Sequence, residues 1–180
     1  GEFAVFPIPR GKHGAAVTVA DVNVSLVNDI NAGKCPYAEP GLGPLIANLH
    51  ASGRLRATTN TSEAASRSDV IVVIVPAHLT PARDIDFDIL QSASADVGRG
   101  LQRGALVIYE TTVGVGGTRR KLIPVLEKHS GLQAGRDFMV GYSPERVKAS
   151  HVLERLETTP KVGGGLDAAS MARTAEVCRE

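Results

Sequence analysis

An aspartate at the end of an apolar segment offers the first side chain that could bind a nucleotide. Asp21 lies at the end of the expected strand within the segment AVTVADV, residues 16–22, and a carboxylate at the end of a strand can accept hydrogen bonds from both hydroxyls of an adenosine ribose. Because this carboxylate would also repel a 2′-phosphate, it favours NAD over NADP. An aspartate before a helix is also a common N-cap, so this structural role stays open.

Two threonines follow another apolar segment. Thr111 and Thr112 come after ALVIYE, residues 105–110. Their hydroxyls could bind a water molecule or a substrate oxygen, or they could satisfy backbone groups of a turn. The string GVGG, residues 114–117, comes next and opens an expected helix, whose first backbone N–H groups suit an anion.

A glutamate follows a third apolar segment, FMVGY, residues 138–142. The carboxylate of Glu145 could serve as a general base or order a water molecule. The alternative is a surface ion pair with Arg146 or Lys148. Neither the five histidines nor the two cysteines show the spacing of metal ligands, so we expect no metal site.

The segment that should position these groups is VIVVIVP, residues 70–76. It is too short to span a membrane, and its β-branched residues favour a strand that is buried on both faces of a parallel sheet. Ligands of such sheets lie beyond the carboxyl ends of the strands. We therefore take this strand as the centre of the fold and expect Pro76 and the following loop to face a binding crevice.

Expected strands and helices alternate along the chain. The expected strands cover residues 3–8, 16–22, 55–58, 70–75, 105–109, 138–142 and 161–163. The expected helices cover residues 25–32, 44–51, 61–66, 86–101, 118–128 and 167–180. This alternation predicts an α/β fold of the Rossmann-like, doubly wound type, with a mostly parallel sheet and helices on both faces.

The start of the chain departs from this fold class. A G-x-G-x-x-G fingerprint should lie about 20 residues before Asp21, and residues 1–20 contain none. We therefore expect the first strand and the glycine-rich loop to be missing or altered. Residues 1–13 would form an irregular N-terminal segment, whose first three residues resemble a cloning remnant. Residues 14–180 would form an incomplete NAD-binding domain.

Composition excludes several classes of function. The net charge is +1, lysines and arginines are scattered, and aromatic residues make up 4% of the chain, so we expect no nucleic-acid partner. No apolar segment approaches the 18 or so residues of a membrane span, so we expect no membrane association. Two cysteines without ligand spacing fit a reducing, cytoplasmic setting.

The chain resembles the NAD-binding domain of the UDP-glucose/GDP-mannose dehydrogenase family in five strings, which occur in the family's order. They are NAGKCPYAEPGL (31–42), GRLRATT (53–59), ETTVGVGGT (110–118), YSPERV (142–147) and TPKVGGG (159–165). The third and fourth strings look most like the branch that acts on UDP-N-acetylmannosamine or UDP-N-acetylglucosamine.

This resemblance implies an NAD-dependent oxidoreductase of polysaccharide biosynthesis. Such enzymes oxidise C6 of a nucleotide sugar, here a UDP-sugar, to the uronic acid with two NAD, and the full-length enzyme would be a homo-oligomer. By resemblance, Asp21 would bind the adenosine ribose, and Val75 and Pro76 would line the NAD crevice. Thr112 would contact NAD and position a catalytic water.

The resemblance also assigns the sugar side of the site. Glu145 would be a catalytic or water-ordering carboxylate in contact with the substrate, and Arg146 and Val147 would offer backbone groups to the sugar. Two departures stand beside these assignments. Ala77 replaces a threonine of the family, and residues 149–150 are Ala-Ser where the family often has Pro-Gly.

The end of the chain sets a further expectation. The printed residues stop before the family's linking helix, its catalytic lysine and asparagine, and its cysteine nucleophile, and Cys178 lacks the surroundings of that cysteine. We therefore expect this chain alone to be inactive and to bind NAD weakly or not at all. Two alternatives stay open: a non-catalytic Rossmann-like binding or assembly module, and an NAD-linked dehydrogenase of the 6-phosphogluconate or 3-hydroxyacid type, against which EPGL and YSPER speak.

Overall fold

The structure, a computed structural model, describes residues 14–145 and 159–179. The chain divides into two compact units. The first unit contains Gly1–Asn60 and Arg146–Pro160, and the second contains Thr61–Glu145 and Lys161–Glu180. Each unit has its own sheet and hydrophobic core. None of the described helices is long and apolar enough to cross a membrane.

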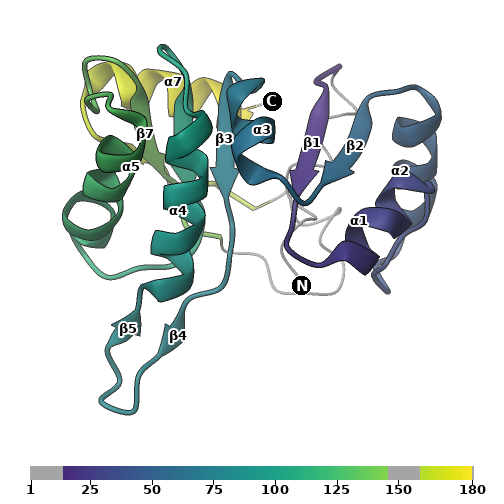
Figure 1. The fold of residues 1–180 in the computed structure, drawn as a ribbon, viewed down its shortest axis with the longest axis horizontal. Helices are drawn as coiled ribbons and strands as arrows, with labels where there is room; N and C mark the ends of the chain where they lie inside the picture. The colour runs from purple at the N-terminus through teal and green to yellow at the C-terminus, as the bar shows by residue number, and fades with distance from the viewer. Residues whose placement is uncertain (1–13, 146–158, 180) are drawn as a thin grey trace. The chain divides into compact units, whose positions relative to one another are not determined.

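The first unit is built on two parallel strands, β1 (Val17–Ala20) and β2 (Leu55–Thr58). Parallel strands cannot be joined by a tight turn, so the chain returns through α1 (Val24–Asn31) and α2 (Leu42–Ala51). Both helices lie on the same side of the strand pair (Figure 1) and share one core with it. The end of β1 is therefore held in place by a packed helical layer.

An asparagine side chain fixes the end of α1 to the neighbouring strand. Asn31 Nδ2 donates to the carbonyl oxygen of Ala57 over 2.9 Å, and the N–H of Ala57 donates to Asn31 Oδ1 over 2.7 Å. The amide thus satisfies a backbone donor and a backbone acceptor of β2, as a neighbouring strand would.

The second unit contains a four-stranded sheet in the order β3-β6-β7-β8. β3 (Val70–Val73), β6 (Leu106–Tyr109) and β7 (Met139–Tyr142) are parallel neighbours, whereas β8 (Gly164–Gly165) is antiparallel to β7. The predicted α/β fold with a mostly parallel sheet is confirmed. The carboxyl ends of β3, β6 and β7 lie at the same edge of this sheet, which brings the residues that follow them together.

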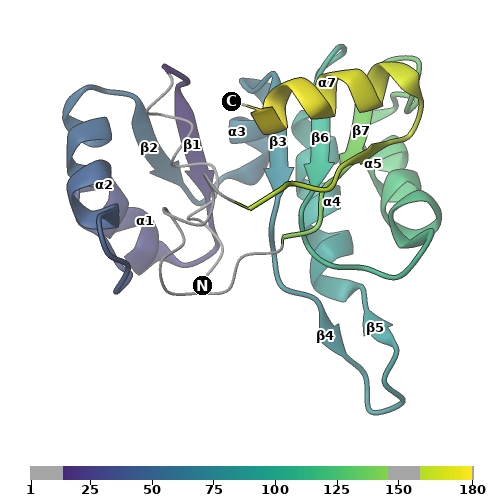
Figure 2. The same cartoon turned by 180° about the vertical axis from the view of Figure 1, so that it is seen from behind.

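Helices cover both faces of this sheet, as predicted. One face packs against α4 (Asp88–Gly100), α5 (Ile123–Ser130) and the short α3 (Thr61–Ser66) (Figure 1). The other face carries α7 (Ala168–Arg179), which lies in front of the strands in Figure 2. Side chains of β6 alternate between the two layers, so this strand is buried on both sides.

A glycine lets α7 approach the sheet closely. A Cβ atom on Gly141 of β7 would lie 2.2 Å from Oγ1 of Thr174 on α7, far inside van der Waals contact. Thr174 is fully buried, and its hydroxyl donates to the carbonyl oxygen of Ser170. Only a residue without a side chain fits at position 141.

The strand expected at the centre of the fold is less buried than predicted. Of β3, only Val73 is buried, whereas every residue of β6 is buried. Within the described residues β3 pairs with β6 alone, and α7 packs over β6, β7 and β8. The central strand of this unit is therefore β6, and the prediction that residues 70–75 are buried on both faces is wrong.

Two other expected elements differ from the structure, and a third cannot be compared with it. The segment after Pro76 forms a hairpin of β4 (His78–Leu79) and β5 (Ile85–Asp86), so the next helix starts at Asp88 and not at residue 86. The last strand lies at Gly164–Gly165 and not at 161–163, and it runs antiparallel. The expected strand at residues 3–8 lies outside the described residues.

The helix expected over residues 118–128 has two parts. A π-helical turn, η2 (Thr118–Leu122), precedes α5, and the N–H of Ile123 donates to the carbonyl of Thr118 five residues before it. Pro124 is the second residue of α5. Since it lacks the N–H that would bind the carbonyl four residues earlier, a wider turn forms at this point.

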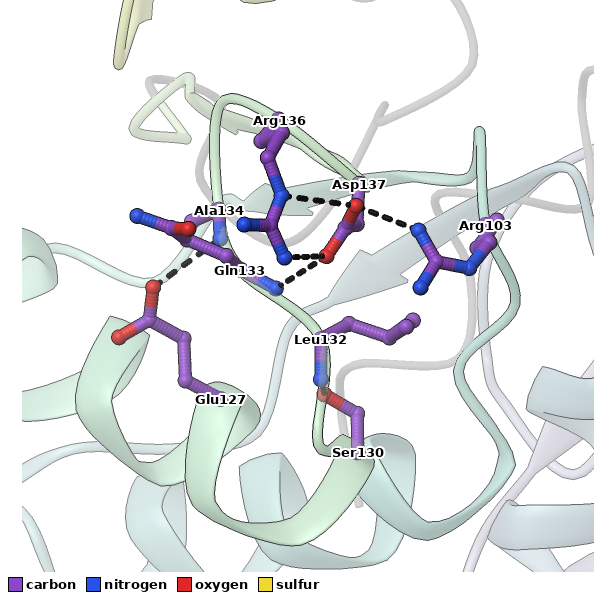
Figure 3. Close-up of polar contacts among 8 residues, drawn as sticks. All are labelled: Arg103, Glu127, Ser130, Leu132, Gln133, Ala134, Arg136 and Asp137. Carbon is purple, nitrogen blue, oxygen red and sulfur yellow. Dashed lines mark hydrogen bonds and ion pairs between the residues drawn. The ribbon is translucent and has the colours of Figure 1, made fainter.

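The loop between α5 and β7 is organised by a buried aspartate (Figure 3). Asp137 accepts from the backbone N–H of Gln133 at 2.9 Å, from Nη2 of Arg136 at 2.8 Å and from Nη1 of Arg103 at 2.5 Å. The hydrogen bond from Arg136, then that from Gln133 and the charge of Arg103, hold the pKa of Asp137 well below its usual value. This carboxylate fixes the entry to β7.

Candidate functional site

In the first unit, Asp21 lies directly after β1. Its N–H donates to the carbonyl oxygen of Thr58 at 3.1 Å, and its Oδ1 accepts from the N–H of Asn23 at 2.8 Å. The N-cap of α1 is Asn23, whose side chain accepts from Ser25 and Leu26. The alternative in which Asp21 caps this helix is therefore wrong.

The position of Asp21 fits one part of a dinucleotide. Its carboxylate is partly exposed at the carboxyl end of a parallel strand, where the ribose diol is bound in this class of fold. No described residue of the first unit is a comparable candidate for binding the pyrophosphate of NAD. Residues 1–20 lack the glycine fingerprint, and residues 1–13 lie outside the described part of the chain. Asp21 therefore has the position of a ribose-binding carboxylate, and its contact with NAD stays a prediction.

In the second unit, a hydrogen bond connects the segments that follow β3 and β6. Oγ1 of Thr111 donates to the carbonyl oxygen of Val75 at 2.5 Å. Thr111 therefore satisfies a backbone group, which was one of its two expected roles. Thr112 is exposed, and Pro76 is half-buried. The structure thus brings Thr111 close to Val75 at the edge of the sheet where ligands are expected.

The glycine string after these threonines forms a tight turn before η2. The N–H of Gly117 donates to the carbonyl of Gly114 at 2.8 Å, and Gly116 has a φ of 77°. Arg120 Nη2 donates to the carbonyl of Val115 at 2.7 Å. A Cβ on Gly116 would lie 2.1 Å from the guanidinium of Arg120. The glycine allows the turn to close over a cationic side chain.

Glu145 lies three residues beyond β7. Its N–H donates to the carbonyl of Glu110 at 3.0 Å, and its Oε2 lies 2.8 Å from Nζ of Lys161. The same Nζ lies 3.3 Å from Oε1 of Glu110, a residue that is 1% exposed. The expected alternative partners of Glu145, Arg146 and Lys148, lie outside the described residues.

Lys161 was not among the residues predicted for the site. The register of β7 and β8 pairs Tyr142 with Gly164, and continuing this antiparallel register places Glu145 opposite Lys161. The carbonyl of Val162 accepts from the hydroxyl of Ser143 at 2.9 Å, which extends the contact beyond the two strands. The string TPKVGGG was recognised in the sequence, but its lysine gave no separate signal.

A tyrosine connects the loop after β6 to β7. The hydroxyl of Tyr142 accepts from the N–H of Val113 at 3.2 Å and lies 3.4 Å from its carbonyl oxygen. This tyrosine begins the string YSPERV, but the string alone does not predict its contact with Val113. It ties the segment that carries Thr112 to the strand that leads to Glu145.

Arg146 and Val147 lie outside the described residues, so their assignment to the sugar stays a prediction. Within residues 14–145 and 159–179, no group of three or more His, Cys, Asp or Glu residues could hold a metal ion.

A mostly parallel sheet with helices on both faces, whose ligands lie beyond the carboxyl ends of the strands, is typical of Rossmann-like dinucleotide-binding domains. The sequence model described as "UDP-glucose/GDP-mannose dehydrogenase family, NAD binding domain" matches residues 6–180. The chain belongs to the UDP-glucose/GDP-mannose dehydrogenase family, as its five strings predict. NAD is the cofactor of this domain.

Two curated relatives illustrate the match. The chain is 34% identical over 174 residues to GDP-mannose 6-dehydrogenase of Azotobacter vinelandii, covering 93% of this chain and 39% of the relative. It is 35% identical over 141 residues to UDP-N-acetyl-D-glucosamine 6-dehydrogenase of Pseudomonas aeruginosa, covering 76% of this chain and 33% of the relative. The chain therefore spans less than half the length of these relatives.

Solved structures agree with the sequence match. The GDP-mannose dehydrogenase of Pseudomonas aeruginosa, solved as a ternary complex, superposes with a TM-score of 0.91 at 30% identity, over 98% of this chain and 41% of that one. The UDP-D-ManNAc dehydrogenase of Pyrococcus horikoshii gives a TM-score of 0.90 at 28% identity, over 97% and 41% of the two chains. The Rossmann-like fold is thus confirmed by structural comparison as well.

Proposed function

We propose that this chain is the NAD-binding part of a nucleotide-sugar 6-dehydrogenase, which oxidises the C6 hydroxyl of a UDP-sugar to a carboxylate with two NAD. The observation that carries the proposal is the family match over residues 6–180, together with candidate site residues that follow parallel strands. Two hydrides leave C6 in successive oxidations, one to each NAD, and water supplies the second carboxylate oxygen.

Four residues would act on the cofactor side. Asp21 would accept hydrogen bonds from the adenosine ribose, and its charge would exclude the 2′-phosphate of NADP. Val75 and Pro76 would line the crevice beyond β3. Thr112, which is exposed beside the anchored Thr111, would orient a water molecule next to NAD. When bound, NAD supplies the hydride acceptor.

Three residues would act on the sugar side. Glu145 would accept a proton or order the water that attacks C6. Its carboxylate follows the carboxyl end of β7, and ligands of such sheets bind beyond the carboxyl ends of the strands. Arg146 and Val147 would offer backbone groups to the sugar. Their roles rest on the YSPERV string.

We favour a UDP-sugar over GDP-mannose because of the YSPERV and ETTVGVGGT strings, although relatives of both kinds match the chain. The complete enzyme would be a homo-oligomer that works in the cytoplasm. The two free cysteines, Cys35 and Cys178, suit a reducing compartment.

The test is NADH formation by a fusion of residues 1–180 to the C-terminal part of the Azotobacter vinelandii relative. We expect NADH from the fusion with a nucleotide sugar, at two NADH per sugar, and none from the Glu145→Gln fusion. The 180-residue polypeptide alone should form none, since the family's nucleophile is not part of it. UDP-N-acetylglucosamine, UDP-N-acetylmannosamine and GDP-mannose are compared to identify the sugar.

A non-catalytic Rossmann-like module is the second candidate, and the missing glycine fingerprint favours it. The same fusion separates the two. If it folds but forms no NADH with any of the three sugars, while the relative with its own N-terminal part remains active, the dehydrogenase proposal is wrong and the non-catalytic module is preferred.

A further inference from the structure

We propose that Lys161 is a positioning residue, which fixes the carboxylate of Glu145 by bridging it to the buried Glu110. This inference rests on the role of Glu145 in the proposed function. It adds a residue that lies outside the acid–base and cofactor-binding groups named above.

The geometry of the bridge is set by three segments of the second unit. Glu110 directly follows β6, Glu145 lies beyond β7, and Lys161 precedes β8. Nζ of Lys161 lies 2.8 Å from Oε2 of Glu145 and 3.3 Å from Oε1 of Glu110. Because an ammonium group has three donors, a single lysine can bind both carboxylates at once.

Burial makes this contact more than a surface ion pair. The side chain of Glu110 is 1% exposed, and those of Glu145 and Lys161 are 19% and 22% exposed. A charged carboxylate in such surroundings is costly unless a cation and hydrogen bonds accompany it. Glu110 therefore fixes the ammonium group of Lys161, and this ammonium group in turn fixes Glu145.

The backbone supports the same arrangement. The N–H of Glu145 donates to the carbonyl oxygen of Glu110 at 3.0 Å, so the two glutamates are neighbours in the backbone as well. Without a cation between them, their negative charges would repel each other, and the side chain of Glu145 would turn away. A group that accepts a proton or orders water needs a fixed direction, because small displacements cost rate.

The contact between Lys161 and Glu145 is tested first in the 180-residue chain, by a double-mutant cycle. Unfolding in urea is measured for Lys161→Met, Glu145→Gln and the double variant. We expect the effects to be non-additive, with a coupling of about tenfold in the unfolding equilibrium constant. Lys161→Arg should keep most of the stability, and Lys128→Met, an exposed lysine of α5, should change little. Additive effects would overturn the contact.

The positioning role is tested in the fusion described above. We expect Lys161→Met to lower kcat by about tenfold or more, with KM for the sugar changed by less than about twofold. Lys161→Arg should restore most of kcat, and Lys128→Met should leave it unchanged. Loss of kcat in Lys161→Met no larger than in Lys128→Met would overturn the positioning role.

If Lys161→Met fails to fold, a second variant still tests the positioning role. The variant Glu110→Gln/Lys161→Met removes the buried negative charge together with the cation, so it should fold while its kcat stays low. Recovery of kcat in this variant would contradict positioning. If the fusion with Lys161 intact forms no NADH, the proposed function fails, and the double-mutant cycle still decides whether Lys161 holds Glu145.

Discussion

The hydroxyl of Thr111 donates to the carbonyl oxygen of Val75 over 2.5 Å. This hydrogen bond joins the segments that leave β3 and β6 and so fixes the edge of the sheet where a ligand is expected. The next residue, Thr112, is exposed. The two adjacent threonines therefore have different tasks: one holds the backbone, and the other is the candidate for contact with water and cofactor.

The first prediction separates these two threonines. Thr111→Val should lower the free energy of unfolding by about 1 kcal/mol or more, because the carbonyl of Val75 loses its donor. Thr112→Val should change it by less than about 0.5 kcal/mol, as expected for an exposed residue. Urea denaturation of the two variants measures both values. A cost for Thr112→Val equal to that for Thr111→Val would contradict this division of tasks.

A second prediction concerns the buried tyrosine of β6. Tyr109 is fully buried, and its hydroxyl lies 2.7 Å from Oγ of Ser94 on α4. Burial raises the pKa of Tyr109 strongly, and the hydrogen bond with Ser94 opposes this only in part. The folded state therefore holds the phenol proton more tightly than the unfolded state does.

The sign of the pH effect follows from linkage. The stability that Tyr109 contributes is fully present below its unfolded pKa, about 10, and is lost as the pH rises above that value. The free energy of unfolding should thus fall in alkaline solution, and Tyr109→Phe should reduce the slope. Urea denaturation at a series of alkaline pH values measures this. Equal slopes for the two proteins would count against a protonated, buried tyrosine.

The third prediction concerns acid. The pKa of Asp137 is held below its usual value by Arg136, Gln133 and Arg103. Its contribution is present above the unfolded pKa of about 3.9 and is lost as the pH falls through and below that value. Asp137→Asn should weaken the acid dependence of unfolding, whereas Asp84→Asn, an exposed residue, should not. Indistinguishable acid transitions in these two variants would contradict the assignment.

Much of the framework follows from sequence because the signals are local. The strand at Leu55–Thr58 has the predicted bounds, and the strand that ends before Asp21 was recognised from its apolar residues. The family strings then point to candidate site residues that no periodicity can reveal. Such local signals show which residues follow the carboxyl ends of strands. In a parallel sheet these ends lie at the same edge, so the residues that follow them come together.

Other features depend on pairing that the sequence does not show. Lys161 reaches Glu145 only because β8 runs antiparallel to β7 in one register. The strand β6 is more buried than β3, and this difference depends on which strands α7 covers. The β4–β5 hairpin has strands of two residues, too short for an alternating pattern, although the string TPARD does carry turn residues.

The fourth prediction tests the central claim, that Asp21 binds the ribose of NAD in a chain whose residues 1–20 contain no G-x-G-x-x-G string. The measurement is a titration of the 15N-labelled chain with NAD and with NADP, followed by NMR. We expect saturable NAD-dependent shifts at the amides near Asp21 and Thr112, with a Kd on the order of 1 mM, about 4 kcal/mol of binding free energy. NADP should bind more weakly, and Asp21→Asn should remove the preference. Shifts that never saturate or that lie elsewhere, or an equal response to NADP, would contradict the claim, and a micromolar Kd would contradict the weak binding expected without a G-x-G-x-x-G string in residues 1–20.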